Sequence, residues 1–272
     1  MTTRYGARAA DDQAFSLPFR LTLIGQAAAG LVFGIAPLVT VAAYASAIGF
    51  TGADPLVYRL GGAATTGYVI APLVALAWRT GWRQIRIPAL ATLTYTLGAF
   101  AASVWEYTTG ARQPVVTFVV VAGALFSVIA AYWLLRDDAP TEDPGRRLSR
   151  PAQGIIGLAT LSAAVFGLLP LVVPSLFASL FGQVGSDTWV FRLAGAGCLG
   201  YATAGIASLM APGYRAIRLQ NFAAITFNAI GAASAWLAIA TGGGGLLAPV
   251  VAVAATFFTV ALIWVDRTHA ET

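Results

Sequence analysis

The chain has 272 residues, of which 58% are hydrophobic and 10% are charged, and its mean hydropathy is +0.76. Soluble domains carry about 25% charged residues, so this composition excludes a single soluble domain and indicates a membrane protein. The formal net charge is +5, and all 16 basic residues are arginine. Because the arginines gather between apolar segments, the membrane surface explains the positive charge, and nucleic acid is not an expected partner.

Eight long apolar segments follow one another along the chain, each about the 20 residues that a membrane-spanning helix needs. They cover residues 21–47, 56–78, 88–108, 114–135, 154–180, 188–210, 219–240 and 246–265. Their continuous apolar character predicts helices, since barrel strands alternate over about ten residues. The first segment is longer than a signal-peptide core and has a mid-chain counterpart, so we interpret it as a spanning helix.

The chain contains an internal repeat with an offset of 133 residues. Residues 33–39 read FGIAPLV, and residues 166–172 read FGLLPLV. The same offset relates Asp54 to Asp187, Arg59 to Arg192, Gly67 to Gly200 and Tyr68 to Tyr201. Four helices per copy give both copies the same orientation. We therefore predict an all-α polytopic membrane protein of two parallel four-helix repeats, 21–135 and 154–265, related by a pseudo-two-fold axis along the membrane normal.

Arginines mark the segments that are expected on the cytoplasmic side of the membrane. Residues 1–20 form a predicted N-terminal tail, 136–153 a linker and 266–272 a C-terminal tail, and all three contain arginine. The opposite loops are short, and Arg112 is their only basic residue. Both termini are therefore predicted to be cytoplasmic. Arginine without lysine, with abundant alanine and glycine, is typical of a GC-rich genome, so we expect the inner (cytoplasmic) membrane of a prokaryote.

Side chains that common membrane enzymes require are scarce. His269, the only histidine, lies in the predicted tail, which excludes histidine-ligated haem, copper or zinc within the membrane. Cys198 is the only cysteine, so a disulfide or dithiol pair is excluded. A G-x-G-x-x-G match at residues 195–200 lies inside a predicted span, where it favours helix packing over nucleotide binding. We expect no metal, no cofactor and no catalytic residue.

Arg59 and Arg192 are the strongest candidates for ligand binding. Each follows an aspartate by five residues, and Asp54 and Asp187 are well placed to cap their helices. Five residues carry each arginine about 7 Å into the helix, where a charge is costly and indicates function. If the arginines face inward, they form an anion-attracting vestibule; if outward, they reach lipid phosphate or a carboxylate. Glu106 is placed to neutralise Arg59, whereas Arg192 has only Asp187 as an evident acid.

Other candidate ligand residues recur in mid-span. Tyr68 and Tyr201 lie beside glycines and are expected to face the bundle, as hydrogen-bonding groups or as a pocket wall. Pro37 and Pro170 predict kinks in the first and fifth helices. The third and seventh spans are the most polar, and we expect both near the interface between repeats; their polar residues include Thr92, Thr94, Thr96, Gln220, Asn221 and Asn228. Of these, Asn228 is the candidate ligand residue.

Two pairs of arginines precede the third and seventh spans with an i, i+3 spacing, which puts each pair on one helix face. They are Arg83 with Arg86 and Arg215 with Arg218. Cations at a helix N-terminus oppose the helix dipole, so helix stability does not explain them. We interpret them as contacts to anionic lipid headgroups.

Three functions remain open at this point. An accessory or scaffold subunit, or a lipid-associated protein, would have a closely packed interior and would bind membrane lipids or other membrane subunits. A transporter or binder of a small molecule or anion would have a cavity between the repeats, lined by Tyr68, Tyr201, Asn228 or Arg192. An enzyme acting on lipid would need a base, and Glu106 is the only carboxylate within the predicted spans. The sequence favours the first.

Overall fold

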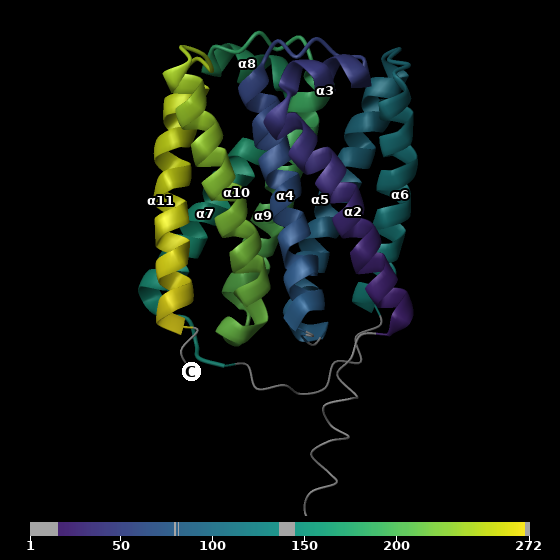
Figure 1. The fold of residues 1–272 in the computed structure, drawn as a ribbon. Coiled ribbons are helices and arrows are strands. Elements are labelled where there is room, and N and C mark those ends of the chain that lie inside the picture. The colour runs from purple at the N-terminus through teal and green to yellow at the C-terminus, as the bar shows by residue number, and fades with distance from the viewer. Residues whose placement is uncertain (1–15, 79, 81, 136–144, 270–272) are drawn as a thin grey trace, which may run out of the picture.

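The computed structural model describes residues 16–78, 80, 82–135 and 145–269, and the regular elements in these ranges are all helices (Figure 1). The first half contains α2 (Leu17–Val39), α3 (Val41–Ile48), α4 (Pro55–Trp78), α5 (Trp82–Thr108) and α6 (Pro114–Leu135). The second half contains α7 (Arg150–Val172), α8 (Pro174–Phe181), α9 (Thr188–Met210), α10 (Tyr214–Ala240) and α11 (Leu247–His269).

Eight of these helices are long and apolar enough to cross a membrane, which confirms the number that the sequence predicts. They are α2, α4, α5, α6, α7, α9, α10 and α11. Within a bilayer a helix satisfies its backbone groups internally, so such a bundle is the expected form for long apolar segments. The chain has the architecture of a multi-pass membrane protein.

The first and fifth predicted spans each form two helices instead of one kinked helix. Thr40 separates α2 from α3 with φ −137° and ψ 73°, and Val173 separates α7 from α8 with φ −129° and ψ 62°. Pro37 and Pro170 lie three residues before these breaks. A proline removes one helical hydrogen bond and crowds the preceding turn, which weakens the helix at that point. The short helices α3 and α8 lie at the end of the bundle opposite the start of α2 and the end of α11 (Figure 1).

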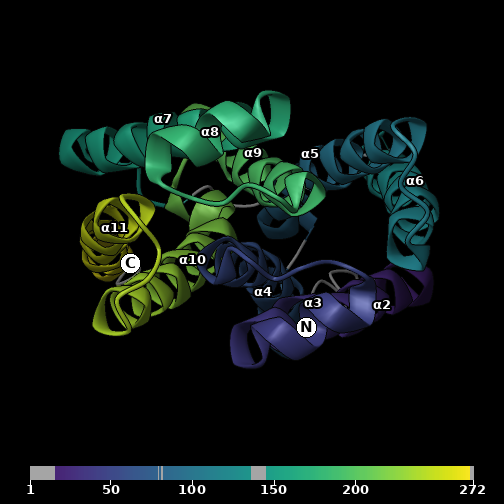
Figure 2. The ribbon, with the colours of Figure 1, turned by 90° about the horizontal axis from the view of Figure 1, so that it is seen from above.

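Helices α4 and α9 lie in the middle of the bundle, and each packs against both halves of the chain (Figure 2). The main neighbours of α4 are α2 and α10, and those of α9 are α7 and α5. On the outside, α6 packs on α5 and α11 packs on α10. The interfaces of α4 with α10 and of α5 with α9 are as extensive as those between helices that follow one another in sequence, so the two halves are closely packed together.

The buried core consists of two clusters of apolar side chains. One contains Tyr68 and Tyr201 together with Ile85 and Ile217. The other lies around Trp189, with residues of α3, α4 and α8. Many of the remaining buried residues are alanine, which lets the helices approach closely, as is usual for packing within membranes.

Candidate functional site

Tyr68 on α4 and Tyr201 on α9 lie ring against ring where the two halves meet, with ring centroids 4.7 Å apart. The Tyr68 hydroxyl donates a hydrogen bond to the carbonyl oxygen of Gly197 at 2.7 Å. The Tyr201 hydroxyl donates to the carbonyl oxygen of Ala64 at 3.1 Å. Both rings are buried. The tyrosines therefore face the bundle, and each hydroxyl bonds to the backbone of the opposite half.

Each tyrosine hydroxyl lies against the glycine that precedes the other tyrosine. A Cβ atom at Gly67 would overlap the Tyr201 hydroxyl and lie 2.7 Å from a carbonyl oxygen of α10. A Cβ atom at Gly200 would overlap the Tyr68 hydroxyl and lie 2.6 Å from a carbonyl oxygen of α5. Neither place has room for a methyl group, so the close approach of the helices requires glycine at both positions.

Asp54 and Asp187 each precede a helix, as predicted, but their carboxylates reach across to the other half. Asp54 accepts hydrogen bonds from the backbone N–H groups of Val184 and Gly185 at 2.7 and 2.8 Å. Asp187 accepts hydrogen bonds from the N–H groups of residues 51 and 52 at 3.1 and 2.9 Å, and makes no side-chain cap to its own helix. The predicted capping role is therefore wrong, because these loops turn two successive N–H groups toward one carboxylate.

The two aspartates differ in the number of groups that they hold. Asp187 also accepts a hydrogen bond from the hydroxyl of Tyr58 at 2.6 Å and from that of Thr51 at 3.0 Å. No such side-chain donor reaches Asp54 among the residues that the structure describes. Asp187 is therefore the more extensively bonded of the two connections between the halves.

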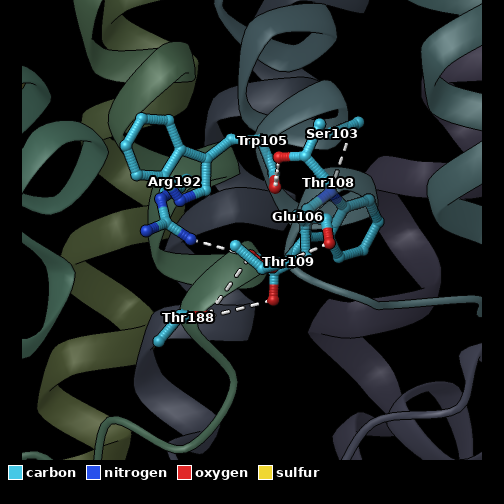
Figure 3. A network of polar contacts seen from close by, with 8 residues as sticks. Ser103, Trp105, Glu106, Thr108, Thr109, Thr188 and Arg192 are labelled. Atoms are coloured by element: carbon cyan, nitrogen blue, oxygen red, sulfur yellow. Dashed lines mark hydrogen bonds and ion pairs between the residues drawn. The ribbon is translucent and has the colours of Figure 1, made fainter.

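Arg192 on α9 forms an ion pair with Glu106 on α5, with 2.7 Å between Nη1 and Oε2 (Figure 3). The Thr188 hydroxyl donates to the same carboxylate at 3.1 Å, and the guanidinium carbon lies 5.5 Å from the ring centroid of Trp105. The expectation that Glu106 neutralises Arg59 is wrong, because α5 has an extensive interface with α9 and only a small one with α4.

Arg59 on α4 has no hydrogen-bond or ion-pair partner in the part of the chain that the structure describes. Its Nε atom is buried, although the side chain as a whole is only partly buried. The side chain lies in an open groove between α2 and α10, lined by Leu38, Ala229, Ile230, Ala233, Ser234 and Leu237. None of these groove residues is acidic.

Two cavities flank the tyrosine pair, and their linings are mostly apolar. The first-half cavity, of about 180 Å³, is lined by residues of α2–α6 and α9, including Tyr68. The second-half cavity, of about 170 Å³, is lined mainly by α7, α9, α10 and α11, including Tyr201 and Asn228. Neither lining contains a charged side chain. Apolar cavities of about 150 Å³ accept molecules the size of benzene, so each could hold a small apolar molecule or part of a lipid tail.

The polar side chains of the first-half cavity bond to one another. The amide of Gln26 donates to the hydroxyl of Thr92 at 2.9 Å. The hydroxyls of Thr65 and Tyr95 lie 3.3 Å apart, within hydrogen-bond distance. These four groups are bonded within the protein, whereas the Tyr44 hydroxyl of the same lining has no hydrogen-bond partner in the described chain.

The second-half cavity contains a polar group without a partner. The Gln220 side chain is only 6% exposed and lines the cavity, and none of the hydrogen bonds in the described ranges involves its amide. Asn228 donates to the carbonyl oxygen of Ala224 at 2.8 Å. The sequence identified Gln220 only as one polar residue of the seventh span; its lack of a partner was not visible in the sequence.

The four arginines assigned to lipid headgroups differ in their surroundings. Arg86 and Arg215 are exposed near the starts of α5 and α10, whereas the Arg83 side chain lies outside what the structure describes. Arg218 is half-buried: its Nε lies 3.5 Å from an oxygen of Asp266, and its guanidinium carbon lies 5.0 Å from the ring centroid of Trp78. Arg218 thus has partners within the protein.

Residues predicted to form the linker and the tail contact each other. α11 continues to His269, which is buried, and α7 begins at Arg150. The backbone N–H of Ser149 donates to Nε2 of His269 at 3.2 Å, and Arg146 donates to the carbonyl oxygen of Thr268 at 3.1 Å. These bonds attach the start of the second half to the end of the last helix.

Comparisons with protein families, with characterised proteins and with solved structures find no match to this chain. Within the described residues, no three His, Cys, Asp or Glu side chains group in a way that could hold a metal ion. The G-x-G-x-x-G match at 195–200 lies inside α9. The geometry of the ion pair, the groove and the two cavities is therefore the basis for inferring function.

Proposed function

We propose that the protein is a membrane-embedded binding protein that holds a small, neutral and mainly apolar molecule in its second-half cavity. One observation carries this proposal: Gln220 is only 6% exposed, it lines a cavity of about 170 Å³, and its amide has no hydrogen-bond partner in the described chain. A buried amide without a partner costs about 1–3 kcal/mol. A ligand that bonds to the amide would remove this cost.

The lining of the cavity defines the chemistry of the ligand. No charged side chain lines it, so a charged ligand group would lose its hydration without compensation. The amide of Gln220 can both donate and accept, and therefore suits a carbonyl or a hydroxyl group. The remaining surface is mainly apolar, which suits an aromatic ring or a short alkyl chain. We infer a neutral lipid-like or aromatic molecule with one oxygen-bearing group.

This function lies between two of the hypotheses that the sequence left open, the lipid-associated protein and the small-molecule binder. The Tyr68–Tyr201 pair occupies the centre between the halves, so we place the ligand beside the pair and not between the repeats. Other membrane subunits remain proposed partners. An enzyme that uses Glu106 as a base is less well supported, because that carboxylate is engaged by Arg192 and Thr188.

We further infer that the halves are parallel repeats, related by a pseudo-two-fold axis along the membrane normal. Two contacts support this inference: Tyr68 bonds to residue 197 and Tyr201 bonds to residue 64, and these positions are related by the same sequence offset of 133. The arginine distribution supports cytoplasmic termini in a prokaryotic inner membrane. The start of α2 and the end of α11 lie at one end of the bundle, which is compatible with that topology (Figure 1).

The proposal can be tested by identifying what the protein retains on purification. Protein reconstituted in lipid nanodiscs would be extracted with organic solvent, and the extract analysed by mass spectrometry. The test variant is Ala254→Leu, which fills the second-half cavity, and the matched control is Ala122→Leu, which fills the first-half cavity. We expect a neutral compound at near-stoichiometric amounts in wild type and in Ala122→Leu, and a large loss in Ala254→Leu and in Gln220→Leu.

Two results would contradict the proposal. One is an extract that contains only the supplied bilayer lipids for every variant. The other is a retained compound whose amount does not depend on Ala254 or on Gln220, since that compound would be bound elsewhere.

A further inference from the structure

A second ligand site is indicated outside both cavities, by a difference between two arginines at corresponding positions. Arg192 has the carboxylate of Glu106 at 2.7 Å, supplied by the neighbouring helix α5. Arg59 lies beside α10. The residue of α10 that corresponds to Glu106 is the apolar Ala238, because α5 and α10 are related by an offset of 132 residues. The cation at Arg59 therefore lacks the anion that its counterpart has.

The absence of a partner is unfavourable at this place in the chain. Arg59 is four residues after the first residue of α4, so its backbone lies about 6 Å along the helix from that end. Its Nε atom is buried and makes no hydrogen bond in the described structure. A charge at this depth is costly without a counter-ion, and a long arginine side chain can reach the headgroup region of the membrane.

The groove around Arg59 is suited to an amphiphile. It has a volume of about 350 Å³ and lies between α2 and α10, and its walls are apolar except for Arg59 and Ser234. Leu38, Ile230 and Leu237 provide surface for a hydrocarbon chain. A free anion would bind the guanidinium but would leave this apolar surface uncovered, whereas a lipid would cover both parts.

We propose that Arg59 binds the phosphate of an anionic membrane lipid, with an acyl chain of that lipid lying in the groove between α2 and α10. Guanidinium and phosphate form paired, charge-assisted hydrogen bonds, which suits arginine at this position. The Ser234 hydroxyl lines the same groove and is a further donor for the headgroup. The site is independent of the cavity that contains Gln220.

The test compares lipids that remain bound to the purified protein. Wild type and variants in nanodiscs of equal parts phosphatidylglycerol and phosphatidylcholine would be released into detergent, and bound lipids counted by native mass spectrometry. We expect wild type to retain one phosphatidylglycerol preferentially, and Arg59→Gln to weaken that binding about tenfold. Arg112→Gln is the matched control, because it removes the same charge from an exposed side chain at the same end of the bundle, and it should leave the preference unchanged.

A second variant keeps Arg59 and gives it a carboxylate partner from within the protein. Leu237→Glu places a carboxylate in the lining of the groove that contains Arg59, and should abolish the lipid preference as Arg59→Gln does. Gln220→Leu should have no effect on it. Inorganic phosphate in solution should not compete with the lipid at millimolar concentration.

Three outcomes would overturn the proposal. Equal retention of both lipids by wild type would mean that Arg59 does not select an anionic headgroup. An equal loss in Arg112→Gln would mean that general surface charge attracts the lipid. Full competition by inorganic phosphate would assign Arg59 to a free anion.

Discussion

The two halves of the molecule make matching contacts where they meet and different contacts at their margins. At the centre, Tyr68 and Tyr201 each bond to the backbone of the opposite half. Near one end, Asp54 and Asp187 each bond to a loop of the opposite half. At the margin, Arg192 has an acidic partner, whereas Arg59 has none among the residues that the structure describes. The matching contacts hold the helices together, and the differing contacts are where ligands would bind.

The cavities repeat this contrast. In the first half, Gln26 bonds to Thr92 inside the cavity lining. In the second half, Gln220 is buried in the lining without a partner. A stable interior normally pairs its buried polar groups, so the unpaired amide of Gln220 marks the place in the second-half cavity where a ligand would bond.

The largest difference in the free energy of unfolding should appear between variants at the Arg192 site and variants at the Arg59 site. Glu106→Leu leaves Arg192 partly buried without its counter-ion, so the free energy of unfolding should fall by about 2–3 kcal/mol. Arg59→Leu removes a partly buried charge that has no partner in the described chain, so in neutral detergent it should leave the free energy of unfolding unchanged or raise it. Unfolding titrations with SDS in mixed micelles would measure both. Similar losses in the two variants would refute the contrast, and Glu106→Leu with Arg192→Leu should recover most of the loss.

Substitutions of the two central glycines, Gly67 and Gly200, should lower the free energy of unfolding by similar amounts, because the two halves make matching contacts there. Gly67→Ala and Gly200→Ala each force a methyl group against a tyrosine hydroxyl and a carbonyl oxygen, so each should lower the free energy of unfolding by about 2 kcal/mol. Gly61→Ala on α4 is the control, since its added Cβ has no atom within 4 Å. The same titration measures all three. An unchanged free energy of unfolding in either central variant would mean that the helices can move apart there without loss of stability.

The aspartates should differ by a smaller amount. Asp187→Asn should destabilise the protein by about 1 kcal/mol more than Asp54→Asn, because Asp187 also accepts the hydrogen bond of the Tyr58 hydroxyl. In a background that lacks both side-chain donors, Tyr58→Phe with Thr51→Val, the two substitutions should have nearly equal effects in the unfolding titration. If the two aspartate variants still differed in this background, the difference would arise from the backbone N–H groups of the loops and not from the side-chain hydroxyls.

The smallest effect should have opposite signs in the two cavities. In delipidated protein, Gln220→Leu should raise the free energy of unfolding by less than about 1 kcal/mol, because it removes a buried amide without a partner. Gln26→Leu should lower it by a similar amount, because Thr92 loses its donor. Melting of the helical signal followed by circular dichroism would measure both. A decrease in both variants would indicate that Gln220 is already satisfied without a ligand.

The sequence predicted the positions of the helices better than it predicted which helices and side chains contact one another. The eight spans are confirmed by the structure, and the prolines at 37 and 170 were correctly associated with a disturbance of the first and fifth helices. The prediction of a kink was too mild, because each helix ends and a second one begins. The predicted pairing of Glu106 with Arg59 was wrong, because it assumed that helices of the same half are the main neighbours.

The sequence identified the arginines of the candidate sites but not the partners of those arginines. Arg59 and Arg192 were conspicuous because a charge in an apolar segment is rare. Which of them lacks a partner depends on the residue that the facing helix presents, Glu106 in one case and an apolar stretch of α10 in the other. Gln220 was predicted only as one of several polar residues in the seventh span, and only its surroundings in the structure distinguish it from the others.

The sequence by itself determined that this chain forms membrane-spanning helices and where they lie, because a long apolar segment must satisfy its backbone internally within a bilayer. Only the tertiary structure decided that α4 packs against α10 and α5 against α9. Helix surfaces in lipid are similarly apolar, so hydrophobicity does not choose between neighbours. The choice depends on local fit, as where Gly67 admits the Tyr201 hydroxyl and Gly200 admits that of Tyr68.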